Sequence, residues 1–150
     1  MHVVAIMPDL RQRHHPDCVV CSPDCAHGLQ LRLALDGQGV AVGTFACDAR
    51  YEGYPGMLHG GVISALLDGA MTNCLFLYGR AAMTAELVVR FRHPVLLGKP
   101  AKVRAWIAQD DPPVFRLQAQ LVQDGVVKAT ARAAFMLPKP VAPSAKVVQS

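Results

Sequence analysis

The sequence has no apolar run of the length that membrane spans require and no segment typical of a secretion signal. A membrane-spanning helix needs about 20 consecutive apolar residues. The apolar segment Val3–Met7 is too short for the core of a signal peptide, and the most apolar stretch, residues 58–78, is interrupted by Asp68. We therefore predict a cytoplasmic protein that has no membrane partner.

The cysteines do not form a recognisable framework of pairs. The chain has five, and an odd number in a reducing compartment argues against disulfides. Cys18 and Cys21 have the spacing of one half of a zinc site, which Cys25, His27, His14 or His15 could complete. Because a second C-x-x-C pair is missing, we favour reduced cysteines in an ordered loop and predict no metal and no cofactor.

A continuous basic block is also missing. Residues 80–150 hold eleven of the fifteen Lys/Arg and four of the eleven Asp/Glu, which gives +7 there and −3 for residues 1–79. These cations alternate singly with apolar residues, and only Phe91 and Phe115 lie beside them as possible stacking platforms for bases. This pattern argues against a nucleic-acid partner. It leaves a solvated sheet face, an anionic lipid surface or a phosphate-bearing small molecule as alternatives.

The sequence does contain an enclosed helix with one carboxylate in it. The apolar residues of 58–78 point in nearly every direction around a helical wheel, which is typical of a helix covered on most sides. Asp68 is the only Asp, Glu, Lys or Arg between Glu52 and Arg80. An ionised carboxylate in apolar surroundings is costly without a partner, water or a function. Asp68 is therefore the leading candidate for chemistry, unless Ser64 and Thr72 cap it as a structural group.

Segments on both sides of this helix alternate apolar and polar residues with a period of two, as half-buried strands do. Two such segments precede the helix and four follow it, and we expect the four to be successive antiparallel neighbours. The predicted fold is an α+β domain at residues 18–138, with about six antiparallel strands curled around one long helix. Residues 1–17 are predicted to form a flexible arm and residues 139–150 a disordered tail. The alternating segments are 29–35, 40–47, 87–92, 103–107, 115–121 and 126–136.

Four motifs occur in a fixed order between Cys18 and Pro138. They are Cys18-x-x-Cys21 with Gly28-Leu29, then Gly53-Tyr54-Pro55-Gly56-x-x-His59-Gly60-Gly61, then Leu66-Leu67-Asp68, and Thr84-x-Glu86-Leu87-x-Val89-x-Phe91-x-x-Pro94. In this order and spacing they resemble the hotdog-fold thioesterases, and among these the PaaI-like acyl-CoA thioesterases.

The resemblance implies hydrolysis of an acyl-CoA thioester. Asp68 would be the general base or nucleophile, the His59-Gly60-Gly61 turn would bind the oxyanion, and Thr84 would orient the water. Free N–H groups at a helix start suit a developing oxyanion, which agrees with this assignment. We also expect substrate contacts from Gly53, Met71 and Thr72, and phosphate contacts from Arg90, Arg92 and Lys99.

Two positions depart from the pattern of the family. Gly53 stands where some relatives have Asn, and Gly69 follows Asp68 where Glu, Thr or Asn is frequent. The Asn contact to substrate would then be missing, and Gly69 would make room for a close approach. His59 could also be no more than a loop residue whose ring bonds a carbonyl.

The distance along the helix predicts that two chains share each site. Asp68 lies seven residues beyond Gly61, about 10 Å along a helix axis. A thioester must contact both groups at about 3 to 3.5 Å, so we predict a homodimer with shared sites, or a tetramer. The alternatives are a non-catalytic acyl-CoA or lipid-binding module and a hydratase or dehydratase of the same fold.

Overall fold

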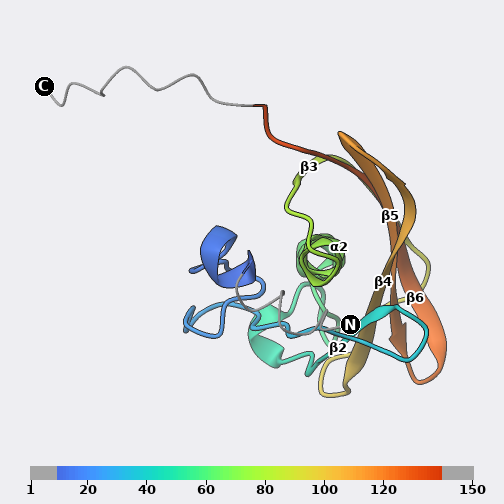
Figure 1. The fold of residues 1–150 in the computed structure, drawn as a ribbon. Helices are drawn as coiled ribbons and strands as arrows, with labels where there is room; N and C mark the ends of the chain where they lie inside the picture. The colour runs from blue at the N-terminus through green and yellow to red at the C-terminus, as the bar shows by residue number, and fades with distance from the viewer. Residues whose placement is uncertain (1–9, 140–150) are drawn as a thin grey trace, which may run out of the picture.

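The computed structural model describes residues 10–139, and Figure 1 shows one long helix lying against one curved sheet. The predictions for residues 1–9 of the arm and 140–150 of the tail lie outside the described residues. The helix is α2 (Gly60–Leu77), and a short 3-10 helix, η1 (Ala49–Tyr51), precedes it. The strands are β1 (Ala34–Leu35), β2 (Ala41–Phe45), β3 (Met83–Phe91), β4 (Ala101–Asp111), β5 (Val114–Gln123) and β6 (Val126–Met136).

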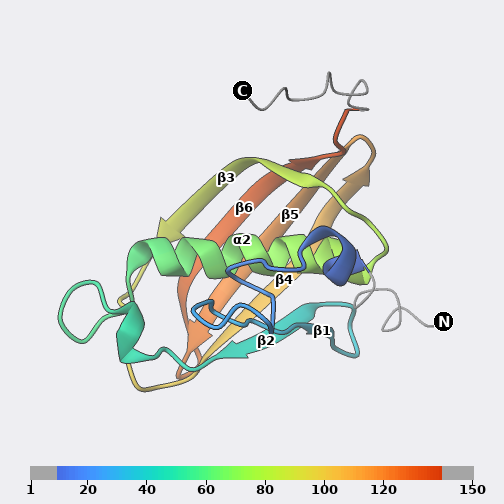
Figure 2. The ribbon, with the colours of Figure 1, turned by 90° about the vertical axis from the view of Figure 1, so that its left-hand side faces the viewer.

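The six strands form an open antiparallel sheet in the order β1-β2-β4-β5-β6-β3. Figure 2 shows α2 lying across the concave face of this sheet. The predicted architecture, a curled antiparallel sheet around one helix, is therefore confirmed.

The order of the strands corrects one prediction. We expected β3 and β4 to be neighbours, but β3 pairs with β6 at the far edge of the sheet, from Met83 opposite Met136 to Phe91 opposite Ala129. The chain between β3 and β4 passes the end of the β5–β6 hairpin, where the buried Gln123 holds it. Gln123 Oε1 accepts from the N–H of Leu96 at 2.8 Å, and its Nε2 donates to the carbonyls of Leu96 and Lys99.

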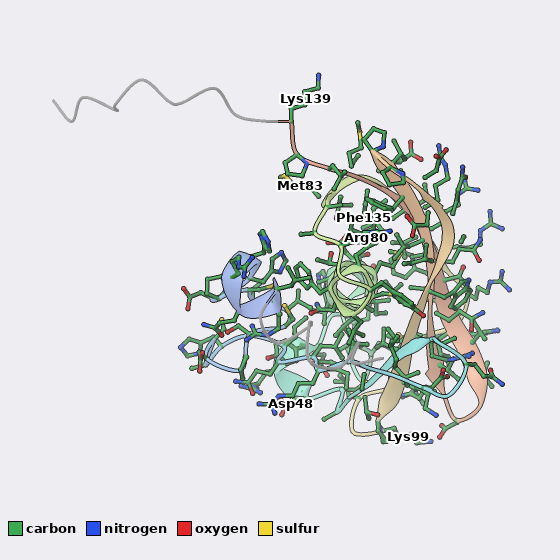
Figure 3. All side chains as sticks on the ribbon, viewed as in Figure 1. Asp48, Arg80, Met83, Lys99, Phe135 and Lys139 are labelled. Carbon is green, nitrogen blue, oxygen red and sulfur yellow. The ribbon has the colours of Figure 1, made fainter. Side chains whose placement is uncertain are left out.

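The alternation in the sequence correctly predicts which side chains face α2. The buried residues on β5 are Phe115, Leu117, Ala119 and Leu121, and those on β6 are Ala129, Ala131, Ala133 and Phe135. Polar side chains project from the opposite, convex face of the sheet (Figure 3). By length and composition α2 also qualifies as a membrane-spanning helix, with a mean hydropathy of 1.4, but 67% of it is buried inside this fold.

The segment before β1 covers the other side of α2 (Figure 1). The predicted strand at residues 29–35 is limited to Ala34–Leu35. Leu29 and Leu31 instead donate their N–H groups to the carbonyls of Val19 and Val20. This stretch is therefore bonded to the loop at residues 18–25, the cysteine loop. Leu31 and Leu33 are still buried, as the alternation requires.

Residues 10–17, which the sequence placed in a flexible arm, contain a helical turn at 10–14. The turn continues into a backbone hydrogen bond from His15 N–H to the Arg11 carbonyl. The His15 ring packs edge-on against Phe76 of α2, with ring centroids 5.1 Å apart. These residues therefore form part of the layer that covers α2.

Candidate active site

The start of α2 presents two backbone donors that have no partner in the part of the chain that the structure describes. His59 is the N-cap in an extended conformation, with φ −61° and ψ 135°, and its Nδ1 accepts from the N–H of Gly61 at 2.8 Å. The N–H groups of Gly60 and Val62 donate to no acceptor among residues 10–139. Unpaired N–H groups at the positive end of a helix dipole attract a developing negative charge on oxygen.

This arrangement changes the roles expected within the His59-Gly60-Gly61 turn. The N–H of Gly61 already bonds to the His59 ring, so the N–H groups left without an acceptor among the described residues are those of Gly60 and Val62. His59 acts on the backbone as an N-cap, through a ring nitrogen that accepts from an N–H, whereas the alternative that we predicted was a ring bonded to a carbonyl. Val62 could not be recognised as a donor from the sequence, because the group that it offers is its backbone N–H and its side chain is apolar.

Asp68 lies half-buried in the middle of α2 and pairs with a hydroxyl from the edge strand. Thr84 Oγ1 on β3 donates to Asp68 Oδ1 at 2.7 Å. The alternative prediction, in which Ser64 and Thr72 cap Asp68 as a structural group, does not agree with the hydrogen bonds of these two hydroxyls. Thr72 Oγ1 donates to the Asp68 backbone carbonyl and Ser64 Oγ to the Gly60 carbonyl, so neither hydroxyl is bonded to the carboxylate.

A third group, His15, lies within electrostatic range of Asp68. Burial lowers the pKa of His15, the neighbouring His14 and Arg11 lower it further, and Asp68 opposes them. The sequence named His15 only as a possible metal ligand. Its approach to Asp68 depends on how residues 10–25 fold back over α2, which no local pattern indicates.

The predicted substrate contacts do not gather around Asp68 within one chain. Met71 is fully buried in the core, and Thr72 is 6% exposed. Gly53 lies instead against the helix start, where a Cβ at this position would be 3.0 Å from His59 Cα. A side chain at this position would therefore lie beside the start of α2.

The predicted phosphate contacts lie away from α2. Arg90 and Arg92 line a hollow of about 330 Å³ together with Trp106 and Arg132, over β3, β4, β5 and β6. Lys99 forms an ion pair with Asp124, with Nζ and Oδ2 3.0 Å apart. Within a single chain, neither the two arginines nor Lys99 is brought to the Asp68 carboxylate.

Strand β3 connects the two halves of the site. Near its beginning Thr84 bonds to Asp68, and at its end Phe91 lies beside the helix start, 3.6 Å from where a Cβ on Gly60 would be. Among the described residues β3 pairs on one side only, with β6. Its exposed apolar side chains are Met83, Val88 and Phe91, which are 67%, 39% and 55% exposed.

Comparison with known sequences yields a match at the start of α2 and the strands that follow. The family described as Thioesterase superfamily matches residues 55–109. Acyl-coenzyme A thioesterase THEM4 from Bos taurus is 44% identical over 46 residues, which cover 31% of this chain and 18% of that protein. The chain thus spans less than a fifth of the length of this curated relative.

Comparison with solved structures extends the likeness to most of the chain. Protein RHA08564, a thioesterase superfamily protein, is 28% identical, with a TM-score of 0.74 over 79% of this chain and 62% of that one. The PaaI protein from the phenylacetic acid degradation operon of E. coli is 18% identical, with a TM-score of 0.75 over 92% of this chain and 95% of that one. The protein smu.793 from Streptococcus mutans UA159, solved bound to acetyl CoA, is 16% identical, with a TM-score of 0.67 over 72% of this chain and 88% of that one.

Proposed function

We propose that the chain is a PaaI-like, hotdog-fold member of the thioesterase superfamily and that it hydrolyses acyl-coenzyme A thioesters to the free acid and coenzyme A. The observation that carries the proposal is the Asp68 carboxylate bonded to Thr84, on the same helix whose start offers the N–H groups of Gly60 and Val62. Hydrolysis of a thioester needs these two elements, an activated oxygen nucleophile and donors for the carbonyl oxygen.

Asp68 can take part in this hydrolysis in either of two ways. As a general base it takes a proton from water while the hydroxyl attacks the thioester carbon. As a nucleophile it forms an anhydride with the acyl group, which water then hydrolyses. In either case the carbonyl oxygen becomes negative beside the N–H donors, and the sulfur leaves as the coenzyme A thiolate, which takes up a proton. Thr84 fixes the orientation of the carboxylate, so we assign it a positioning role.

We propose that each site is formed by two chains. Within one helix the carboxylate and the donors are about 10 Å apart along the axis, too far for one thioester group. If the free edge of β3 pairs with β3 of a second copy around a twofold axis, Thr84 of one copy faces Phe91 of the other. Asp68 of each copy then lies beside the helix start of its neighbour, which generates two equal sites. The exposed apolar side chains of β3 support this pairing.

Coenzyme A would be held by cations on or near the same strand. Arg90 and Arg92 belong to the β3 end of the sheet, and guanidinium groups form bidentate hydrogen bonds with phosphate. Lys99 would have to leave its exposed ion pair with Asp124, which costs little. The acetyl CoA bound to smu.793 supports a coenzyme A ligand for this fold. A cytoplasmic location is part of the same proposal.

The test is thiol release from a panel of short, medium, long and aryl acyl-CoA substrates, for the wild type and Asp68→Asn. We expect release of coenzyme A with at least one substrate, and a fall of at least about tenfold in kcat/KM for Asp68→Asn, which corresponds to about 1.4 kcal/mol. Binding without release would indicate a lipid-binding module. Consumption of an enoyl-CoA without thiol release would indicate a hydratase, and either result would refute the proposal.

A further inference from the structure

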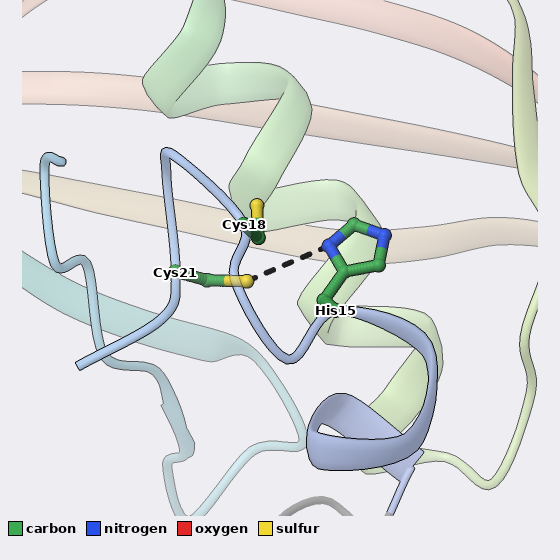
Figure 4. Close-up of side chains that lie close together, drawn as sticks. All are labelled: His15, Cys18 and Cys21. Carbon is green, nitrogen blue, oxygen red and sulfur yellow. Dashed lines mark hydrogen bonds between the residues drawn. The ribbon is translucent and has the colours of Figure 1, made fainter. Parts of the chain in front are cut away.

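A group of three potential metal ligands lies on the side of α2 opposite the sheet. His15, Cys18 and Cys21 each offer one ligand atom, and these atoms all lie within 4.8 Å of one another. Figure 4 shows the three side chains converging between the helical turn at 10–14, the cysteine loop and α2. The other ligands that the sequence suggested, Cys25, His27 and His14, are outside the group found among residues 10–139.

One distance in this group, between a sulfur and an imidazole nitrogen, is that of tetrahedral zinc ligands. Zinc binds thiolate sulfur at about 2.3 Å and imidazole nitrogen at about 2.0 to 2.1 Å, which at a tetrahedral angle separates the two ligand atoms by about 3.6 Å. Cys21 Sγ and His15 Nδ1 are 3.6 Å apart. A thiol–imidazole hydrogen bond also explains this one distance. It does not explain why the second sulfur, from Cys18, lies in the same small volume.

The backbone of the cysteine loop is arranged around the Cys18 sulfur. The N–H of Val20 points at Cys18 Sγ, with N and S 3.3 Å apart, and Ser22 N–H closes a turn by bonding to the Cys18 carbonyl. This turn brings both sulfurs of the C-x-x-C segment to one side.

A buried polar group on α2 borders the site. The Asn73 side chain interacts with Cys21, is fully buried, and donates from Nδ2 to the Gly69 carbonyl. Its Oδ1 is a buried oxygen without a hydrogen-bond partner among the described residues. A buried carbonyl oxygen normally has a partner. A cation, or a water bound to a cation, would supply one.

We propose that His15 Nδ1, Cys18 Sγ and Cys21 Sγ bind one zinc ion, with Asn73 Oδ1 completing the shell directly or through a water. Two thiolates and a neutral imidazole make the complex with Zn²⁺ electrically neutral, which suits its position against an apolar helix. The ion fixes residues 10–25 to α2 beside Asn73, which is five residues along the helix from Asp68. Its role is therefore to hold the layer that covers the carboxylate, separate from the proposed hydrolysis.

The first experiment measures metal content. The full chain is expressed in zinc-supplemented medium, purified under reducing conditions without chelator, and analysed by elemental mass spectrometry. We expect about one zinc per chain in the wild type and less than about a tenth of that in Cys21→Ser. Cys25→Ser is the matched control, since it removes a half-exposed thiol from the same loop and should keep the zinc.

The second experiment uses wild-type protein, so it does not depend on how a variant folds. After chelation, added Co²⁺ should produce the sulfur-to-cobalt charge-transfer band and intense visible absorption of a tetrahedral thiolate site. Chelation should lower Tm by about 5 °C or more, and zinc should restore it. Wild-type protein without stoichiometric zinc and without the cobalt spectrum would overturn the proposal, as would a Cys18–Cys21 disulfide in protein purified under reducing conditions.

Discussion

Asp68 and Thr84 are the residues on which the proposed chemistry depends most directly. Asp68 could be identified from sequence because it is the only charge in an apolar helix. Its partner is sixteen residues away on an edge strand, and their hydrogen bond exists only because β3 runs beside α2. Thr84 was expected to orient water, whereas in the structure it is bonded to the carboxylate itself.

Thr84→Val removes this hydrogen bond while keeping the shape of the side chain. A hydrogen bond to a charged group contributes about 1.5 to 3 kcal/mol. We expect kcat for acyl-CoA hydrolysis to fall about 10-fold to 100-fold with little change in KM, measured by thiol release. Thr44→Val, at an exposed position on β2, is the control. An unchanged kcat for Thr84→Val would remove the positioning role.

The thiol of Cys74 should be unreactive in the folded protein. Cys74 is fully buried, its Sγ donates to the Ala105 carbonyl at 3.6 Å, and burial raises its pKa to about 12. Because only the thiolate reacts, Cys74 should resist iodoacetamide at pH 8 and be labelled after denaturation. Peptide mass spectrometry would compare it with the half-exposed Cys25. Rapid native labelling of Cys74 would contradict the buried position.

Among the elements, α2 is enclosed on two sides, and a single glycine allows the second layer to approach. A Cβ on Gly69 would overlap the side chain of Val20. The cysteine loop therefore packs into the space that the side chain of any other residue at this position would occupy. We predicted from the sequence that Gly69 makes room for a close approach. The structure shows that the approaching group is a loop side chain from about fifty residues earlier.

Gly69→Ala therefore has two opposing effects. Replacing a mid-helix Gly by Ala favours the helix by about 1 kcal/mol, and the clash with Val20 costs about 1 to 3 kcal/mol or more. We expect a net loss of unfolding free energy of about 1 to 2 kcal/mol in urea denaturation. In a Val20→Ala background the same substitution should be neutral or stabilising. Equal effects in both backgrounds would exclude the contact as the cause.

The strands were predictable and their order was not, for a physical reason. Alternation such as that of Leu117, Ala119 and Leu121 reports only which face of a strand is buried, and β5 and β6 are joined by a tight turn that fixes them as neighbours. The link from β3 to β4 contains the same turn-forming residue types. Its path depends on hydrogen bonds with Gln123, a contact between distant parts of the chain.

On the scale of the whole molecule, the free edge of β3 is the feature that the single chain leaves unexplained. The groups proposed for catalysis lie at opposite ends of this strand, beside Thr84 and Phe91. Helix geometry alone predicted from the sequence that Asp68 and the helix start are far apart. The edge position of β3 could not be predicted, because β4 was expected to lie beside it. Pairing between two copies accounts for both observations.

Val88→Lys should weaken this pairing. Val88 lies near the centre of β3 and is 39% exposed, and a charge on an edge strand opposes edge-to-edge association. Light scattering after gel filtration should give a dimer or larger assembly for the wild type and a shift toward the single-chain mass for the variant. Val126→Lys, at a 44% exposed position at the start of β6, is the control. A wild type that is an active monomer at assay concentration would refute the shared site.

The most direct measurement mixes two chains of strongly reduced activity, one with Asp68→Asn and one with Gly60→Pro. Proline removes the Gly60 N–H but is tolerated at the first position of a helix, and His59 already has the extended backbone that precedes proline. If each site combines Asp68 of one copy with the helix start of the other, each mixed dimer has one intact site. Equal mixing should then restore about a quarter of wild-type thiol release. Mass spectrometry should verify that the chains have exchanged. If they have exchanged and no activity returns, the shared site is contradicted.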